Sequence, residues 1–318
     1  MRLILHVGHP KCASTTVQSL LWNNRAYLAG QGLHLLGAGL QLPHENAGWD
    51  WPLWDVNQDA QFGDRLVERL PDFRAQGIGS LILSAENLAQ PAILAHVQAA
   101  FPHCRTTALY YVRRQDDFLV SSWRQWGMKR GISLVQHLLR RVAEGKPEYL
   151  AVARHLAQCL GHVAVRVGVL DPAFLEGGTI ERDLWAALNL AGVPDRAADQ
   201  ANPSPDRASL IFLAAHPELF ASEHDDRAVQ QLLAADPLPP RRLRLDAHLQ
   251  RSLKMLYDGA NRDLVQEFLG RPDGESMIQP DNPASATSLS LEPADVVRLK
   301  AMLPQVTMPE LRRALAAL

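Results

Sequence analysis

The chain has 318 residues, of which 47% are hydrophobic and 21% charged, and its formal net charge is −2. This composition is typical of a folded globular protein and excludes a disordered or collagen-like chain. The small net charge predicts no broad surface for a polyanion and therefore no nucleic-acid partner, so any basic site must be local. The length suffices for a sizeable core.

Targeting signals and cysteine usage restrict the expected compartment. The sequence contains no run of about 18 apolar residues, so we expect no integral membrane segment. The first apolar run leads directly into Lys11, unlike a secretory leader, and the three cysteines form no CxxC pair. We therefore expect a reduced, cytoplasmic protein without a zinc site. The sequence leaves its oligomeric state open.

The N-terminal part predicts a strand, a loop and a helix in direct succession. An apolar run at residues 3–7 predicts the strand, and Pro10 interrupts the chain shortly afterwards. In residues 14–29 the apolar positions fall on one face, which predicts a single amphipathic helix. Residues 37–63 are rich in Trp, Pro, Asn and Asp and predict a long loop or lid.

Further apolar runs, each bounded by charged or turn residues, predict more strands; they lie at residues 81–83, 108–112 and 163–169. Helical patterns separate these strands. Strands that alternate with helices predict an α/β fold of three layers, in which helices flank a parallel sheet. Ligands of such sheets bind at the carboxyl ends of the strands, where Lys11, Glu86 and Arg113 follow their strands.

Beyond residue 203 the pattern is helical, with a long amphipathic stretch at residues 241–269. This predicts a helical C-terminal extension of the α/β fold. The expected organisation is an α/β nucleotide-binding core over residues 1–200, its helical continuation over 201–278, and a linker with a helical tail over 279–318.

The residues after the first strand are typical of a phosphate-binding loop, since a lysine and three hydroxyl residues open the following helix. An ATP- or GTP-dependent kinase would need a glycine before its lysine and a hydroxyl residue after it, where this chain has Pro10 and Cys12. A kinase is disfavoured but stays open. A cysteine phosphatase would need an arginine six positions after Cys12, where this chain has Gln18, and is excluded.

The loop resembles the 5′-phosphosulfate-binding loop of sulfotransferases that use 3′-phosphoadenosine-5′-phosphosulfate (PAPS); it reads Pro10-Lys11-Cys12-Ala13-Ser14-Thr15-Thr16. The family usually has glycine at Ala13, and alanine tolerates positive φ poorly. A second run, from Val112 to Ser122, resembles the family's 3′-phosphate-binding segment, in which an arginine at a strand end and a serine eight residues later hold that phosphate. These residues would be Arg113 and Ser121.

The resemblance implies a P-loop fold in which the loop from Lys11 to Thr16 binds PAPS. It also implies that the reaction leaves 3′-phosphoadenosine-5′-phosphate (PAP) as product and requires no metal. It also implies a base at the end of the strand before the 3′-phosphate strand, which would be Glu86. Alternatively, Glu86 caps the following helix or pairs with an arginine. His44 is the rival base, because histidine suits proton transfer near neutral pH.

The activity implied by the resemblance is transfer of a sulfuryl group from PAPS to a hydroxyl, or less readily an amine, of a small molecule, glycan or lipid. Two alternatives stay open: a P-loop nucleotide or small-molecule kinase, and a noncatalytic sulfotransferase-like binding protein, which Ala13 suggests. The Arg-Lys-Gly segment that completes the 3′-phosphate site in cytosolic animal enzymes is not evident. Its candidates here are Arg271, Lys129 and Arg130.

Overall fold

The computed structural model describes residues 1–43, 62–100, 104–190, 192, 204–236, 238, 241–271, 277 and 289–318. The chain forms two compact units. The first comprises residues 1–114, 148–201 and 259–277, and the second comprises residues 115–147, 202–258 and 278–318. The chain changes unit at residues 202 and 278, near the boundaries expected from composition, and also at 115, 148 and 259, which no shift of composition marks.

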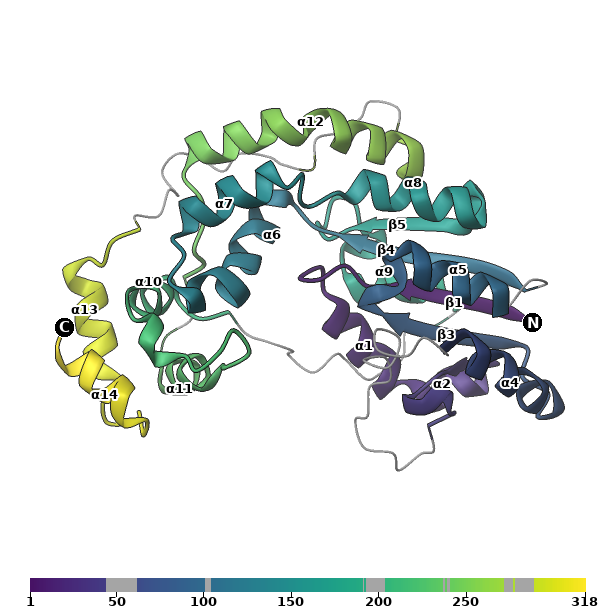
Figure 1. Cartoon of the computed structure of the whole chain (residues 1–318), viewed down its shortest axis with the longest axis horizontal. Coiled ribbons are helices and arrows are strands. Elements are labelled where there is room, and N and C mark those ends of the chain that lie inside the picture. Colours follow the sequence, from purple (N-terminus) through teal and green to yellow (C-terminus); the bar gives the residue numbers. More distant parts are fainter. Residues whose placement is uncertain are drawn as a thin grey trace. The chain divides into compact units, whose positions relative to one another are not determined.

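The first unit is built on a five-stranded sheet in the order β2-β3-β1-β4-β5, and all of its strand pairs are parallel. Helices flank the sheet (Figure 1). The α/β class with C-terminal helices, expected from the sequence, is confirmed. The strands are β1 (Arg2–Val7), β2 (Leu33–Leu35), β3 (Ser80–Ala85), β4 (Arg105–Val112) and β5 (Val165–Val169).

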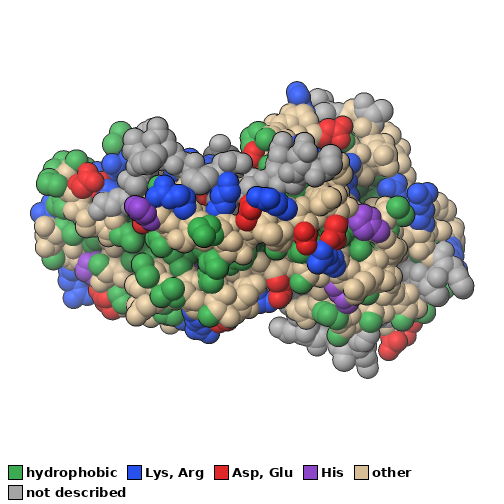
Figure 2. All heavy atoms as spheres, turned by 90° about the horizontal axis from the view of Figure 1, so that it is seen from above, with side chains coloured by type: hydrophobic (Ala, Val, Ile, Leu, Met, Phe, Trp, Pro, Cys, Tyr) green, Lys and Arg blue, Asp and Glu red, His purple; other side chains and the backbone are tan. Residues whose placement is uncertain are grey.

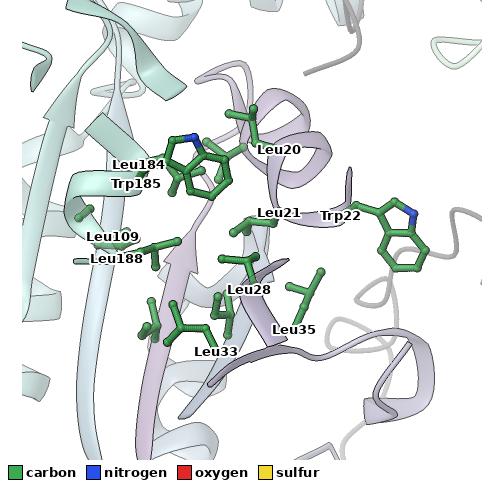
Figure 3. Packing of buried hydrophobic residues seen from close by; sticks show 14 of the residues in the cluster. Leu20, Leu21, Trp22, Leu28, Leu33, Leu35, Leu109, Leu184, Trp185 and Leu188 are labelled. Carbon is green, nitrogen blue, oxygen red and sulfur yellow. The ribbon is translucent and has the colours of Figure 1, made fainter. Parts of the chain in front are cut away.

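One face of this sheet packs against three helices, α1 (Ser14–Asn23), α2 (Arg25–Gly30) and α9 (Ile180–Ala187). Figure 3 shows the Trp185 ring beside Leu20 and Leu184, with further leucines of α2, β2 and β4 around it. Trp185 is only 2% exposed. Burying a side chain of this size contributes several kcal/mol and fixes α1 and α9 against the strands.

The opposite face of the sheet receives the alternate side chains of the strands. Tyr111 on β4 belongs to the core beneath α1 and α9, so its neighbour Tyr110 points to the other face. There α8 (Tyr149–Leu160) lies against β4 and β5, and α5 (Pro91–Ala100) lies beside α8. The three-layer arrangement follows from this alternation. The first unit also contains α4 (Phe62–Ala75).

The helix expected over residues 14–29 is two helices. Asn24 separates α1 from α2 with φ −107° and ψ 15°. Its buried side-chain amide donates to the Leu20 carbonyl at 2.8 Å, and its backbone N–H donates to the same oxygen at 3.2 Å. A side chain that competes for backbone acceptors interrupts a helix. This interruption does not change which positions are apolar, so the amphipathic pattern continues across the break.

The described residues of the second unit form helices and connecting loops, and none of them forms a strand. The segment after β4 begins as α6 (Gln115–Ser122), widens into a π-helical turn (Trp123–Gly127) and ends at Gly131 in the left-handed region, with φ 70°. Trp123 is buried, and Trp126 is half-buried. The remaining helices are α7 (Leu134–Ala143), α10 (Arg207–Ala215), α11 (Arg227–Ala235), α13 (Pro293–Ala301) and α14 (Pro309–Ala316), with α12 (Ala247–Leu269) beginning in this unit.

A buried group of charged side chains, here called the ion cluster, joins three segments of the second unit. Two carboxylates, Asp206 and Asp295, have fully buried side chains. Arg298 reaches Asp206 at 3.0 Å, Arg241 reaches Asp295 at 2.5 Å, and Arg207 also pairs with Asp295. The cluster attaches α13 to the start of α10, because each arginine lies across from a carboxylate on another segment.

On the face drawn in Figure 2, Lys and Arg side chains are interspersed with Asp, Glu and apolar side chains. Within the described ranges, no helix is both long and apolar enough to cross a membrane. The candidate site residues expected from the sequence follow the ends of the strands.

Candidate functional site

The candidate residues of the first unit lie at the carboxyl edge of three neighbouring strands. Lys11 follows β1, Glu86 follows β3 and Arg113 follows β4, and these strands are adjacent in the order β3-β1-β4. The chain leaves β1 toward β2 and β3 on one side, whereas β4 is followed by β5 on the other side. Open parallel sheets bind ligands where the connections diverge in this way, which here is between β1 and β4.

The loop between β1 and α1 contains two residues in the left-handed region. Lys11 and Ala13 have positive φ, 64° and 58°, and Cys12 lies between them. Ala13 is the N-cap of α1, yet no side chain caps this helix and its first turn contains no acidic residue. The first N–H groups of a helix have no intrahelical acceptor, and together with the positive helix end they favour a bound anion.

Ala13 marks the departure from the sulfotransferase pattern, and the structure gives it the conformation that glycine usually supplies. Its φ and ψ, 58° and 21°, lie in the left-handed region. This conformation costs a non-glycine residue about 1–2 kcal/mol. The loop therefore keeps its shape with alanine, at the expense of local strain.

Cys12 holds the loop in place through its buried side chain. Its side chain is 1% exposed, and its sulfur lies 3.5 Å from the Tyr149 hydroxyl and 3.8 Å from Nδ1 of His9. The His9 ring meets the Tyr149 ring edge-on, with centroids 5.0 Å apart. Burial raises the pKa of Cys12 to about 11, so the thiol stays protonated near neutral pH and is not a nucleophile.

The contribution of Cys12 to the loop is thus positional. Its backbone N–H donates to the His9 carbonyl at 3.0 Å and closes the turn. The thiol faces Tyr149, and the expected cofactor contact of Cys12, which belongs to the backbone of the loop, stays a prediction. Tyr149 itself escaped the sequence analysis, since it is 137 residues away and nothing in its neighbourhood signals the contact.

Glu86 lies against the start of α1. The buried Ser14 hydroxyl donates a hydrogen bond to Oε1 of Glu86. The approach is close, because a Cβ placed on Gly8 would lie 3.2 Å from both Cα of Glu86 and Cβ of Ser14. Glycine at position 8 lets the ends of β1 and β3 come together at this distance.

An acidic residue in the first turn of a helix suits the capping alternative for Glu86. Glu86 begins a short 3-10 turn (Glu86–Ala89), but in the part of the chain that the structure describes it forms no ion pair with an arginine. Its partner is instead a hydroxyl of the phosphate loop.

Arg113 connects the end of β4 to the phosphate loop. Its Nη1 donates to the Lys11 carbonyl oxygen at 3.1 Å, and both residues are half-buried. The sequence expected these two residues at one edge, and the structure brings them into contact. Thr15 and Thr16 lie in the first turn of α1, half-buried.

Two expected site residues are not joined to this group. Ser121 is half-buried on α6, in the second unit, and its pairing with Arg113 stays a prediction. His44 lies outside the described residues, as does most of the expected lid.

The candidates for completing the 3′-phosphate site have other contacts. Lys129 pairs with Asp226 at 2.7 Å and Arg130 pairs with Glu223, all in the second unit. Arg271, in the first unit, donates to the Ala173 carbonyl at 2.8 Å and lies over the Phe174 ring. Their role toward a 3′-phosphate stays a prediction.

A second buried polar pair supports the strand ends. His6 on β1 and Ser84 on β3 are register partners, and Nδ1 of His6 lies 2.7 Å from the Ser84 hydroxyl. Burial lowers the pKa of His6 to about 3, so its imidazole is neutral. The signal in the sequence is one polar residue in each of two apolar runs. The pair lies two positions before Gly8 and Glu86 and ties their strands together.

Comparison of the chain with protein-family models, curated proteins and solved structures finds no match. The sulfotransferase resemblance therefore depends on the motif residues themselves. Among the residues with described placement, no group of three or more His, Cys, Asp or Glu side chains is arranged to hold a metal ion.

Proposed function

We propose that this protein is a sulfotransferase that transfers a sulfuryl group from PAPS to a hydroxyl or amine of a small molecule, glycan or lipid. The observation that carries the proposal is the meeting of two motifs, the Arg113 guanidinium on the Lys11 carbonyl at 3.1 Å. Two sequence motifs 102 residues apart, each resembling one half of a PAPS site, thus share one strand edge.

In this proposal the phosphate loop holds the 5′-phosphosulfate. The uncapped N-terminus of α1 supplies backbone N–H groups, including that of Ser14, whose hydroxyl donates to Glu86. Thr15 and Thr16 supply hydroxyls. Arg113 offers a planar guanidinium to the 3′-phosphate, with Ser121 as its expected second partner. The nucleotide would span the ends of β1 and β4.

The transfer step follows from the charges at this edge. The acceptor oxygen forms a bond to sulfur while the bond between sulfur and the bridging oxygen breaks, and the electron pair stays on the 5′-phosphate of PAP. Lys11 stabilises the negative charge on that leaving oxygen, and Glu86 takes the acceptor's proton from the opposite side. Positioning and charge stabilisation dominate such a step, as in phosphoryl transfer.

One contact favours a second candidate, a P-loop kinase. The Ser14 hydroxyl and the Glu86 carboxylate together are the kind of oxygen ligands that hold Mg²⁺ beside nucleotide phosphates. Against this candidate, Pro10 and Cys12 flank the lysine where a Walker A loop needs glycine and a hydroxyl residue.

Nucleotide binding separates the two candidates. We expect PAP to raise the melting temperature in the presence of a metal chelator, and to do so more than AMP, which lacks the 3′-phosphate. A ligand at a hundred times its Kd stabilises the folded state by about 2.7 kcal/mol, which a thermal-shift assay detects. Stabilisation by ATP with Mg²⁺ but not by PAP would reject the sulfotransferase.

Transfer itself is tested with PAPS labelled in its sulfur and separate pools of phenols, glycans and lipids as acceptors. Labelled product should form with at least one pool. A protein that binds PAP tightly but labels no pool would be the noncatalytic alternative.

A further inference from the structure

We infer that Glu86 makes the site selective for a transferable group with one negative charge, a sulfuryl group, against a phosphoryl group of the same shape. This inference rests on the proposed function. Glu86 contacts the start of α1 through the Ser14 hydroxyl. A group bound by the backbone N–H groups at the start of α1 lies roughly 4–6 Å from the carboxylate, because Ser14 belongs to both contacts.

The charge of Glu86 is close to the loop and is not cancelled by an ion pair. Its Cα and Cγ lie against Gly8, where an added Cβ would approach each to 3.2 Å. In the described part of the chain, no lysine, arginine or histidine pairs with it. Its field reaches the loop: burial raises the pKa of Cys12, and the Glu86 carboxylate adds to that increase.

The cations at this edge attract any anion and therefore cannot discriminate in favour of the lower charge. Lys11 lies in the loop itself, and Arg113 contacts the Lys11 carbonyl. Both favour a dianion over a monoanion, and the carboxylate opposes them. Glu86 is thus the group whose charge separates a sulfuryl from a phosphoryl ligand.

PAPS and 3′-phosphoadenosine-5′-diphosphate have terminal groups of the same shape but of different charge. PAPS ends in a sulfuryl group with one negative charge. In 3′-phosphoadenosine-5′-diphosphate a phosphoryl group replaces it, and at pH 8 that group carries two, since its last pKa is about 6. The ratio of their dissociation constants therefore measures discrimination by charge.

We would measure both dissociation constants by isothermal titration calorimetry at pH 8, with a chelator and without acceptor. For the natural chain we expect the carboxylate to offset the cations, so that PAPS binds at least as tightly as the diphosphate. Glu86→Gln should reduce this ratio about tenfold, whereas Glu86→Asp, which keeps the charge, should retain most of it. Glu86 is exposed, so these variants should fold.

Asp72→Asn is the matched control. It removes one exposed carboxylate from α4, which precedes the amino end of β3, whereas Glu86 follows the carboxyl end. Its ratio should equal that of the natural chain. An equal ratio in Glu86→Gln and in the natural chain would overturn the inference and leave the nucleotide site standing. Failure of the natural chain to bind PAP or PAPS at all would overturn the proposed function and this inference with it.

Discussion

The carboxyl edge of the sheet and the ion cluster use charged side chains in opposite ways. At the sheet edge, Glu86 and Arg113 contact a hydroxyl and a carbonyl oxygen, both uncharged. In the ion cluster, the carboxylates of Asp206 and Asp295 are fully buried and bound by arginines. Paired charges inside the protein hold segments together, whereas the Glu86 carboxylate, hydrogen-bonded to a hydroxyl, keeps its field for a ligand.

The largest expected effect lies in the ion cluster. Asp295→Asn should lower the free energy of unfolding by about 3–5 kcal/mol, because it leaves buried arginine charge without its carboxylate. Urea unfolding followed by circular dichroism measures this loss. The control is Asp72→Asn, whose exposed pair with Arg69 at 3.2 Å should contribute below about 1 kcal/mol. Equal losses in the two variants would contradict the assignment of stability to the cluster.

Acid should weaken the same cluster. Burial alone would raise the pKa of Asp206, but hydrogen bonds from Arg241 and Ala208 outweigh it and hold that pKa below its ordinary value of 3.8. Asp295 is held low by the Glu292 N–H and Arg241, again against burial. A carboxyl whose pKa is lower in the folded state stabilises the protein above its unfolded pKa. That stability is lost as the pH falls below about 4. The urea midpoint should drop more steeply there in the natural chain than in Asp295→Asn.

At the sheet edge the expected effect is on activity. Lys11→Ala should lower turnover with labelled PAPS at least about a hundredfold, equivalent to about 2.7 kcal/mol, because the charge on the leaving oxygen loses its cation. The half-buried lysine lies in the loop after β1, outside the ion cluster, so urea unfolding should change little. Full turnover in this variant would remove Lys11 from the chemistry.

Arg113→Ala tests the role of Arg113 at the carboxyl edge of the sheet. Affinity for PAP should fall about tenfold or more, while affinity for AMP falls less, since the guanidinium is assigned to the 3′-phosphate. Calorimetric titration with both nucleotides measures the difference. If both affinities fall equally, Arg113 acts through its contact with the Lys11 carbonyl alone.

The smallest effect concerns the strained loop residue. Ala13→Gly should stabilise the protein by about 0.5–1 kcal/mol, because relief of the left-handed strain exceeds the greater freedom of glycine in the unfolded chain. Affinity for PAP should be kept or raised. A loss of stability on thermal unfolding would show that neighbouring contacts compensate the strain at Ala13.

The apolar runs that form β1, β3 and β4 could be predicted because each is long and sharply bounded. Their parallel order then places Lys11, Glu86 and Arg113 at one edge, which required only the alternation of strands and helices. The strand β2 could not be predicted, because three residues with His34 in the middle carry no periodic signal.

The features that could not be predicted depend on individual side-chain contacts. The break at Asn24 depends on a side-chain hydrogen bond that leaves the helical pattern unchanged. The anchoring of Cys12 by Tyr149 depends on how α8 packs against β4, which no local pattern encodes. For the same reason the sequence placed residues 115–147 in the α/β core, although their contacts belong to the second unit.

The alternation of the chain between its units constrains synthesis and dissection. β5 enters the sheet only once residues 165–169 have emerged, and the first unit receives its last stretch with residues 259–277. A nascent chain must therefore keep an incomplete sheet until residue 169 has emerged, and an incomplete first unit until residue 277 has emerged. For the same reason no single proteolytic cut releases both units intact, and a shortened gene ending at any internal codon encodes at least one unfinished unit.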